Sequence, residues 1–149
     1  MKKPRDWYVV ADGGRARFLT RREDTVAFDT FLELNAPSLH APARHLGTDR
    51  PGRAHESASS TRHAIQPRMD PHQVAKRDFV REVARIANEA GAHGEYDRLF
   101  IAAPPRVLAE LLDDLEVNAD WRLGGILRKD LTHVPEADLA SHLEDMKMP

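Results

Sequence analysis

The chain has 149 residues and a formal net charge of −2, which fits one globular domain with its own hydrophobic core. The absence of cysteine excludes a disulfide framework, a thiolate zinc site and a cysteine nucleophile, and it suits a reducing cytoplasm. The apolar run near the amino terminus, Trp7–Ala11, is too short for a secretory signal or for a membrane span of about 20 residues. We therefore expect one cytoplasmic domain, residues 1–149, that does not insert into a membrane.

The first part of the chain predicts a three-stranded antiparallel meander. Trp7–Ala11 is continuously apolar, as expected of a strand buried on both faces. Asp12 and the Gly13-Gly14 pair then predict a tight hairpin with positive φ angles at the glycines. A second, half-exposed strand follows, in which Ala16 and Phe18 alternate with arginines. The third strand is predicted to place one set of residues on a single face: Val26, Phe28, Thr30, Leu32 and Leu34.

The hydrophobic periodicity then disappears, and residues from about 40 to 70 are predicted to form one long, basic loop. From Arg44 to Arg68 the net charge is +3, whereas from Glu110 to the end it is −6. The segment has almost no large apolar side chains, so it cannot form a core of its own. Loops of this length in a compact domain are generally functional or disordered. A basic segment on an acidic domain is a candidate polyanion contact, although arginines paired with acids of their own domain would give the same pattern.

Regular structure returns at Asp70-Pro71, where an aspartate N-cap precedes a proline at the first helical position. The apolar stripe of this helix is predicted to be Ala75, Phe79, Val83, Ile86 and Ala90, and Gly91 is predicted to close it. The remaining elements are a buried strand over Leu99–Ala103, a helix from Pro104-Pro105, a strand over Trp121–Lys129 and a last helix from Pro135.

The order of elements, βββαβαβα, defines the fold class. Strand–helix–strand crossovers after the meander imply parallel pairing with right-handed connections. The simplest α/β arrangement is a mixed five-stranded sheet of order 3-2-1-4-5, in which only the second strand runs antiparallel to the others. This is the ribonuclease-H-like arrangement.

Several stretches, in order along the chain, carry a resemblance to a known family. They are Trp7–Arg17, Asp49–Arg53, Ser57–Ala64, Ala102–Arg106 and Lys129–Pro135. Through them the chain resembles the bacterial host attachment protein family, whose name describes a phenotype and implies no chemistry. The family is similar to the middle domain of archaeal and eukaryotic peptide-chain release factors. That domain has three strands, a long basic loop, a long helix and then α/β units.

In release factors the long loop carries Gly-Gly-Gln, which enters the peptidyl-transferase centre and promotes hydrolysis of peptidyl-tRNA. The resemblance places residues 44–68 in the position of that loop. The tripeptide itself is absent, because Gly13-Gly14 lies in a hairpin and the two glutamines of the chain are Gln66 and Gln73.

One alignment of the loop suggests a degenerate catalytic position. If Ser57-Ala58 corresponds to the Ser-Ala that follows the tripeptide, Glu56 occupies the glutamine position, where a carboxylate would repel the developing oxyanion. Glu56, Gln66 and His63 are the catalytic candidates that remain for a hydrolase of the peptidyl-tRNA ester type.

The arginines of the loop are the main binding candidates. One guanidinium can hold two phosphate oxygens, and arginine-rich segments often become ordered only on binding RNA. The RNA-binding candidates are Arg44, Arg50, Arg53, Arg62 and Arg68. The ribosome or a structured RNA is the expected partner.

No metal site and no cofactor are predicted. His45, His55 and His63 are separated by intervals that match no compact ligand signature. Asp12 and Asp130 are both expected at the carboxyl edge of the sheet, where ribonuclease-H-like nucleases place metal-binding carboxylates. No third carboxylate follows a strand, and each aspartate also fits an ordinary role in a turn.

A second polar site is predicted where the fifth strand meets the last helix. Its candidates are Asp12, Lys129, Asp130, Thr132 and His133. A triad of Ser57, His63 and Asp49 can also be drawn, but it lacks the context of a nucleophile elbow. Turn and loop hydrogen bonding is the simpler interpretation of both groups.

These patterns favour a translation-associated ribosome- or RNA-binding factor, including a degenerate peptidyl-tRNA release or ribosome-rescue factor. The first alternative is a protein-interaction module that supports attachment to host cells or surfaces indirectly. The second is a metal-dependent nuclease on a ribonuclease-H-like fold. The sequence leaves open whether the protein turns over a substrate.

Overall fold

The computed structural model describes residues 3–23, 25–36, 70–116 and 122–146, which form an α/β fold on one five-stranded sheet. The strands are β1 (Asp6–Ala11), β2 (Arg15–Arg21), β3 (Phe28–Asn35), β4 (Arg98–Ala103) and β5 (Leu123–Arg128). The helices are α4 (Pro71–Ala92), α5 (Pro105–Asp114), the 3-10 helix η3 (Glu136–Asp138) and α6 (Leu139–Leu143).

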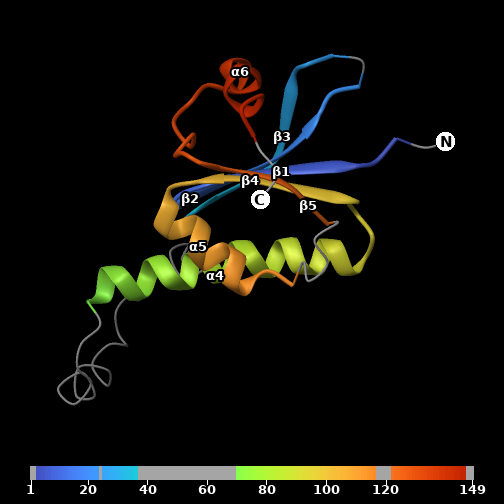
Figure 1. Cartoon of the computed structure of the whole chain (residues 1–149). Coiled ribbons are helices and arrows are strands. Elements are labelled where there is room, and N and C mark those ends of the chain that lie inside the picture. Colours follow the sequence, from blue (N-terminus) through green and yellow to red (C-terminus); the bar gives the residue numbers. More distant parts are fainter. Residues whose placement is uncertain (1–2, 24, 37–69, 117–121, 147–149) are drawn as a thin grey trace, which may run out of the picture.

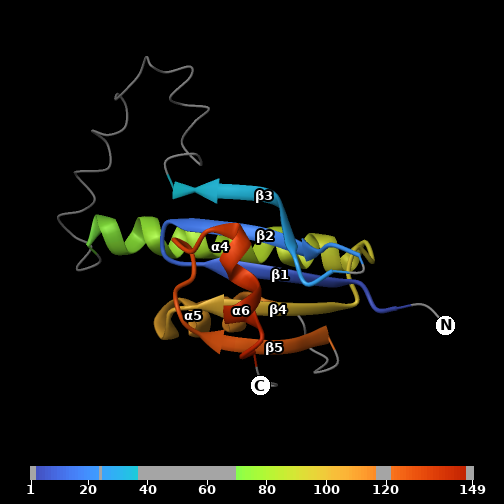
Figure 2. The ribbon, with the colours of Figure 1, turned by 90° about the horizontal axis from the view of Figure 1, so that it is seen from above.

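The sheet has the order β3-β2-β1-β4-β5 (Figure 2). β1 pairs antiparallel with β2 and parallel with β4, β2 pairs antiparallel with β3, and β4 pairs parallel with β5. Among the described strands, β2 therefore runs against all the others. The order 3-2-1-4-5 and the mixed pairing predicted from the sequence are confirmed, and they are consistent with the ribonuclease-H-like arrangement.

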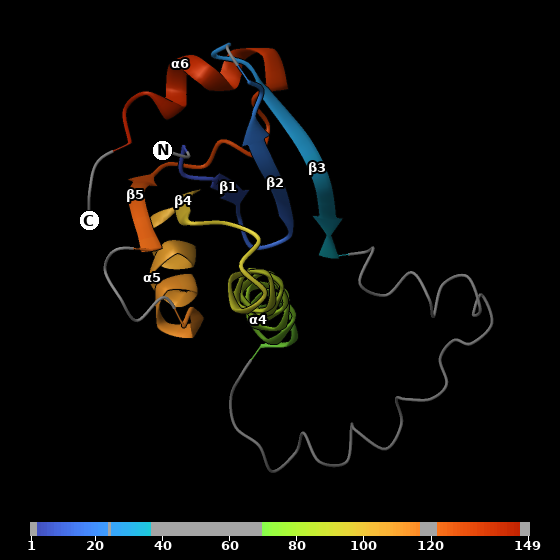
Figure 3. The same ribbon diagram turned by 90° about the vertical axis from the view of Figure 1, so that its right-hand side faces the viewer.

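Helices cover both faces of the sheet (Figures 1 and 3). α4 and α5 lie on one face, and α6 lies on the other. β1 contributes to both apolar clusters: Val9 and Ala11 pack on the side of α4 and α5, whereas Tyr8 and Val10 pack on the side of α6. The prediction that this strand is buried on both faces is confirmed. Because β1, β4 and β5 are parallel, their carboxyl ends lie at one edge of the sheet.

β3 departs from the predicted alternation because a β-bulge interrupts its pairing with β2. The register shifts opposite Phe31, which becomes an extra residue between the paired positions Thr30 and Leu32. Residues on the two sides of the bulge therefore face opposite ways: Phe28 packs in the cluster beside α6, and Leu32 packs against the cluster beside α4. The predicted single face over Val26, Phe28, Thr30, Leu32 and Leu34 is wrong for this reason. Val26 also precedes the strand and is 63% exposed.

The start of α4 agrees with the prediction. Asp70 is the N-cap, and its carboxylate accepts a hydrogen bond from the backbone N–H of His72 at 3.1 Å. The predicted apolar stripe holds from Phe79, which is fully buried. Ala75 is exposed, contrary to the prediction, because the first turns of α4 extend past the edge of the sheet (Figure 1).

The end of α4 differs from the prediction at Gly91. This glycine lies inside the helix and is buried, and a β-carbon on it would come 2.7 Å from the hydroxyl oxygen of Tyr96. The Tyr96 hydroxyl donates a hydrogen bond to the carbonyl of Ala87 at 2.8 Å. Gly91 therefore makes room for Tyr96, and the positive φ of 70° that follows the helix belongs to Gly94.

The later elements begin within a few residues of their predicted positions. α5 starts at Pro105, as predicted, and buries Leu108 and Leu111. β5 starts at Leu123, and the predicted start of this strand at Trp121 lies outside the described residues. The last predicted helix is observed as two segments. A turn of 3-10 helix, η3, follows Pro135, and the α-helical turns of α6 come after it.

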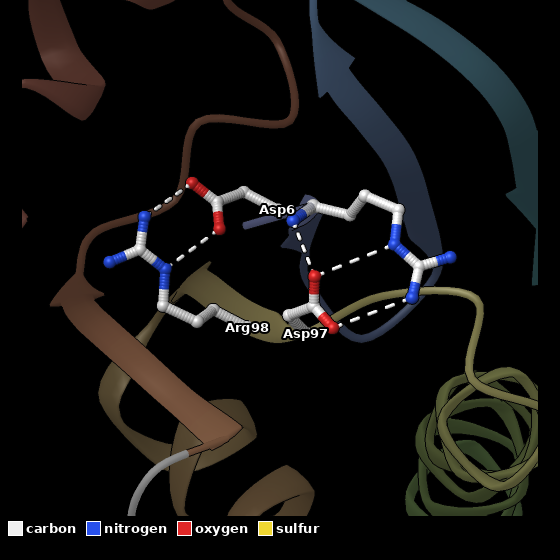
Figure 4. A network of polar contacts seen from close by, with 4 residues as sticks. Asp6, Asp97 and Arg98 are labelled. Atoms are coloured by element: carbon white, nitrogen blue, oxygen red, sulfur yellow. Dashed lines mark hydrogen bonds and ion pairs between the residues drawn. The ribbon is translucent and has the colours of Figure 1, made fainter. Parts of the chain in front are cut away.

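Ion pairs hold the amino ends of β1 and β4 together, at the edge opposite the carboxyl ends (Figure 4). Asp6 and Arg98 form two hydrogen bonds of 2.8 Å. Asp97 accepts a hydrogen bond from the backbone N–H of Arg5 at 2.7 Å. It also accepts two longer hydrogen bonds, of 3.4 Å, from the guanidinium of Arg5. The backbone hydrogen bond and then the side chain of Arg5 lower the pKa of the Asp97 carboxyl.

The lowered pKa of Asp97 predicts a pH-dependent contribution to stability. Because the folded state favours the ionised carboxylate, the contribution is present above its ordinary pKa of 3.8 and is lost as the pH falls through the folded value. We expect Asp97→Asn to lower the Tm slightly at pH 7, since the pair is exposed. The difference in Tm from wild type should shrink as the pH falls below 3.8. Asp113→Asn, on the exposed side of α5, is the control, and a difference in Tm that is independent of pH would contradict this assignment.

Candidate functional site

The residues that follow three of the strands lie at one edge of the sheet. Asp12 follows β1, Pro104 follows β4 and Asp130 lies two residues beyond the end of β5. These three strands run parallel to one another, so their carboxyl ends share an edge, which is where α/β sheets most often bind ligands. The predicted location of Asp12 and Asp130 at this edge agrees with the structure.

Asp12 closes the hairpin between β1 and β2. Its Oδ1 accepts hydrogen bonds from the backbone N–H groups of Gly14 at 2.7 Å and Arg15 at 2.8 Å. The predicted positive φ angles at Gly13 and Gly14 are wrong, since Gly94 is the glycine with positive φ in the described part of the chain. The side chain of Asp12 holds the turn instead. Gly13 allows the side chain of Lys76 on α4 to come close to the hairpin, because a β-carbon at position 13 would lie 3.2 Å from that side chain.

Thr132 links Asp12 to Asp130. Thr132 is only 5% exposed, and its Oγ1 lies 3.0 Å from Oδ2 of Asp12 and 2.5 Å from Oδ1 of Asp130. Its backbone N–H also donates to Oδ1 of Asp130 at 2.9 Å. The turn role considered for Asp130 is therefore observed, and this turn is connected through one buried hydroxyl to the end of β1.

Two arginines of β2 hold the segment after β5 against the hairpin. Arg17 Nη1 donates to the carbonyl of Val134 at 2.6 Å and contacts that of Thr132 at 3.5 Å. Arg15 Nη1 lies 3.3 Å from Nδ1 of His133. Sequence patterns do not indicate that these arginines reach the last loop, because their partners are more than 110 residues away and two are backbone carbonyls.

The structure thus brings together four of the five predicted polar-site residues: Asp12, Asp130, Thr132 and His133. Lys129 is exposed and, within the described residues, makes no hydrogen bond to the other four. One donor atom from each of Asp12, Asp130 and His133 can be chosen so that all three lie within 4.8 Å of one another. Two carboxylates and one imidazole in this arrangement can together bind a cation.

A groove with a volume of about 910 Å³ adjoins this network. Its walls are the β1–β2 hairpin and the first turns of α4 and α5, and both Ala36 and Asp70 line it. Four basic side chains line the groove, from three elements: Arg15, Lys76, Arg77 and Arg106. Three acidic residues are also present, of which Asp12 and Asp70 already accept hydrogen bonds from backbone N–H groups.

The basic residues of the groove were not singled out from the sequence as a binding set. Lys76 and Arg77 reach the groove because α4 extends past the sheet, which its sequence pattern does not show. Arg106 belongs to one of the stretches that carry the family resemblance, Ala102–Arg106. Its position in the first turn after a buried parallel strand is a signal that could have identified it.

The loop candidates lie outside the described residues. They are the RNA-binding candidates Arg44, Arg50, Arg53, Arg62 and Arg68, and the catalytic candidates Glu56, His63 and Gln66. Their roles stay predictions. The described residues that flank this segment in the chain, Ala36 and Asp70, both line the groove.

Fold and site define a class: a mixed α/β protein of ribonuclease-H-like sheet order, with a polar network and a basic groove at the carboxyl ends of its parallel strands. A family model described as "Protein required for attachment to host cells" matches residues 7–143. The chain belongs to this family, and the resemblance predicted from its motifs is confirmed. No curated protein matches the chain. No helix within the described residues is long and apolar enough to cross a membrane.

Proposed function

We propose that this host attachment family protein binds structured RNA, with the ribosome as the favoured partner. The groove and the arginine-rich segment 44–68 together would form the binding surface. The observation that carries the proposal concerns the two described residues that flank residues 37–69 in the chain. Ala36 and Asp70 both line the groove that also contains Arg15, Lys76 and Arg106. Residues 37–69, whose net charge is +3, are therefore joined at both ends to residues that lie beside further basic side chains.

The local backbone supports binding of phosphate groups at the groove. α4 and α5 both begin there, but the first backbone N–H groups of α4 already bond to Asp70. α5 has no side-chain cap, so its amino terminus presents backbone N–H groups and the positive end of the helix dipole to the groove. Arginine can contact two phosphate oxygens at once, and lysine adds a point charge. The groove therefore combines the two elements of sequence-independent recognition of a nucleic-acid backbone.

The exposed apolar residues give less support to the alternative, a protein-interaction module. Large exposed hydrophobic side chains in the described part of the chain are Val26, Phe31 and Val74, which lie before β3, in β3 and in α4. Single exposed apolar residues are normal on soluble proteins. A protein partner remains the outcome to be adopted if RNA binding fails.

The proposal predicts a steep dependence of binding on salt. Binding of a fluorescent ribosomal RNA hairpin, and co-sedimentation with ribosomes, should both weaken as salt rises, because neutralised phosphates release their counterions. Lys76→Gln combined with Arg106→Gln should lower the affinity and flatten the plot of log K against log salt by about 0.7–0.9 per lost contact. Arg50→Gln with Arg53→Gln should do the same if the segment contributes.

Arg85→Gln provides a matched control on α4. Arg85 is exposed, lies outside the groove and pairs with Glu82 at 2.8 Å and Glu89 at 3.2 Å. Its replacement should leave both the affinity and the slope unchanged. If the wild type shows no salt-sensitive association with ribosomes or structured RNA, the RNA proposal fails and the protein-interaction module becomes the favoured function.

A further inference from the structure

Asp12, Asp130 and His133 form a compact group of metal-ligand types beside the groove. Their donor atoms lie within 4.8 Å of one another. Ligands of one ion at about 2.1 Å are at most about 4.2 Å apart. Asp130 and His133 are exposed, so their side chains can close this small difference without moving the core.

The buried Thr132 hydroxyl lies between the two carboxylates of this group. Oγ1 has one hydrogen, yet it contacts Oδ1 of Asp130 at 2.5 Å and Oδ2 of Asp12 at 3.0 Å. One hydrogen serves one carboxylate, so the other oxygen–oxygen contact has none of its own. A close contact of this kind between a buried hydroxyl and a second carboxylate is costly unless a cation or a further proton is present.

No described basic side chain supplies that charge directly. Arg17 is turned to the carbonyls of Val134 and Thr132, and Arg15 to the ring of His133. Within the described residues neither aspartate forms an ion pair with a lysine or an arginine. Two carboxylates at a solvent-accessible edge therefore lack a cationic side-chain partner in this part of the chain.

Both carboxylates are oriented by hydrogen-bond contacts, Asp12 through both of its oxygens and Asp130 through Oδ1. Backbone N–H groups of the hairpin occupy Oδ1 of Asp12, and Thr132 occupies Oδ1 of Asp130. Oδ2 of Asp130 has no hydrogen-bond partner among the described residues. For Asp130, one oxygen is therefore fixed and the other is presented, as in the usual outer-shell support of a metal site.

We infer that Asp12, Asp130 and His133 bind one divalent transition-metal ion at the carboxyl edge of the sheet. Two carboxylates with one imidazole favour Mn²⁺ or Zn²⁺ over Ca²⁺, which prefers a set of oxygen ligands only. Binding would displace the contact between His133 and Arg15, which lies at the surface. Because Asp12 also lines the groove, the ion would face any phosphate bound there.

The inference is independent of RNA binding and is tested with the untagged full chain and MnCl₂ alone. Loss of the free-Mn²⁺ EPR signal should show saturable binding of one ion per chain. In a ¹⁵N-labelled sample, substoichiometric Mn²⁺ should broaden the amide signals of residues 12–15 and 130–133 before those of α6 or of the amino ends of the strands. ZnCl₂ should compete with Mn²⁺ for the site.

Variants of the two exposed ligands separate this site from nonspecific binding. Asp130→Asn, which keeps an acceptor for the Thr132 N–H, and His133→Gln should each weaken Mn²⁺ binding about tenfold or more, with unchanged circular dichroism. Asp113→Asn, near the opposite end of α5, should bind as the wild type does. Absence of saturable binding to the wild type, or equal binding by the wild type and both ligand variants, would overturn the inference.

Discussion

Phe79→Ala is expected to lower the free energy of unfolding by about 3–5 kcal/mol, the range for deleting a fully buried aromatic side chain. Phe79 is 0% exposed and is the first buried residue of α4, where that helix reaches the sheet. It belongs to the cluster that joins α4 and α5 to β1, β2 and β4. The loss combines the transfer free energy of the ring with that of the cavity left behind. It would remove a large share of the roughly 5–15 kcal/mol that stabilises a domain.

Urea unfolding followed by circular dichroism gives the measurement, with the slope m expected to stay unchanged. Leu111→Ala, at a residue of α5 that is 1% exposed, should cost about 2–5 kcal/mol. Val74→Ala is the control on the same helix, since Val74 is 40% exposed and should change the stability by less than about 0.5 kcal/mol. A cost for Phe79→Ala close to that for Val74→Ala would mean that α4 does not pack on the sheet as described.

The order of the sheet was predictable because it rests on strong local signals. Trp7–Ala11 and Leu99–Ala103 are apolar runs of strand length, and helices between the later strands require parallel crossovers. The start of α4 was predictable for the same reason, because its N-cap signal consists of two adjacent residues, Asp70 and Pro71. These features act over short distances, and sequence patterns report them well.

The errors in β3 and α4 came from tertiary arrangement, and the error in the hairpin came from the hydrogen bonds of the Asp12 side chain. The bulge at Phe31 arises in the pairing of β3 with β2, and it turns the side chains that follow it to the other face of the sheet. The exposure of Ala75 follows from the length of α4 relative to the sheet. The φ angles of Gly13 and Gly14 depend on how Asp12 folds back onto the turn. None of these is encoded in the local alternation of apolar residues.

The candidate site also has features that the sequence predicts and features that it does not. Parallel topology placed Asp12 and Asp130 at one edge, and their nearness to Thr132 follows from it. The contributions of Arg15 and Arg17 did not follow, because they depend on the path of the loop after β5 across β2. The groove required the overhang of α4, which no periodicity in the sequence indicates.

Thr132→Val is expected to destabilise the fold by about 1.5–3 kcal/mol, because it removes a buried hydrogen bond to a charged group while keeping the volume of the side chain. Thr132 is 5% exposed, and its hydroxyl is the direct link between the end of β1 and the turn after β5. In the variant, two carboxylate oxygens face a methyl group. The desolvation cost of those oxygens is then no longer offset by the hydroxyl.

A double-mutant cycle distinguishes loss of this link from loss of packing. Thr132→Ser keeps the hydroxyl and removes one methyl group, so it should cost about 0.8 kcal/mol, less than Thr132→Val. In the Asp12→Asn background one of the two charges is already absent, so Thr132→Val should cost at least about 0.5 kcal/mol less than in the wild type. Additive effects of the two substitutions would show that Asp12 and Thr132 are not coupled. Greater damage from Thr132→Ser than from Thr132→Val would assign the role of Thr132 to its methyl group, and would remove the buried hydroxyl as the link between the two carboxylates.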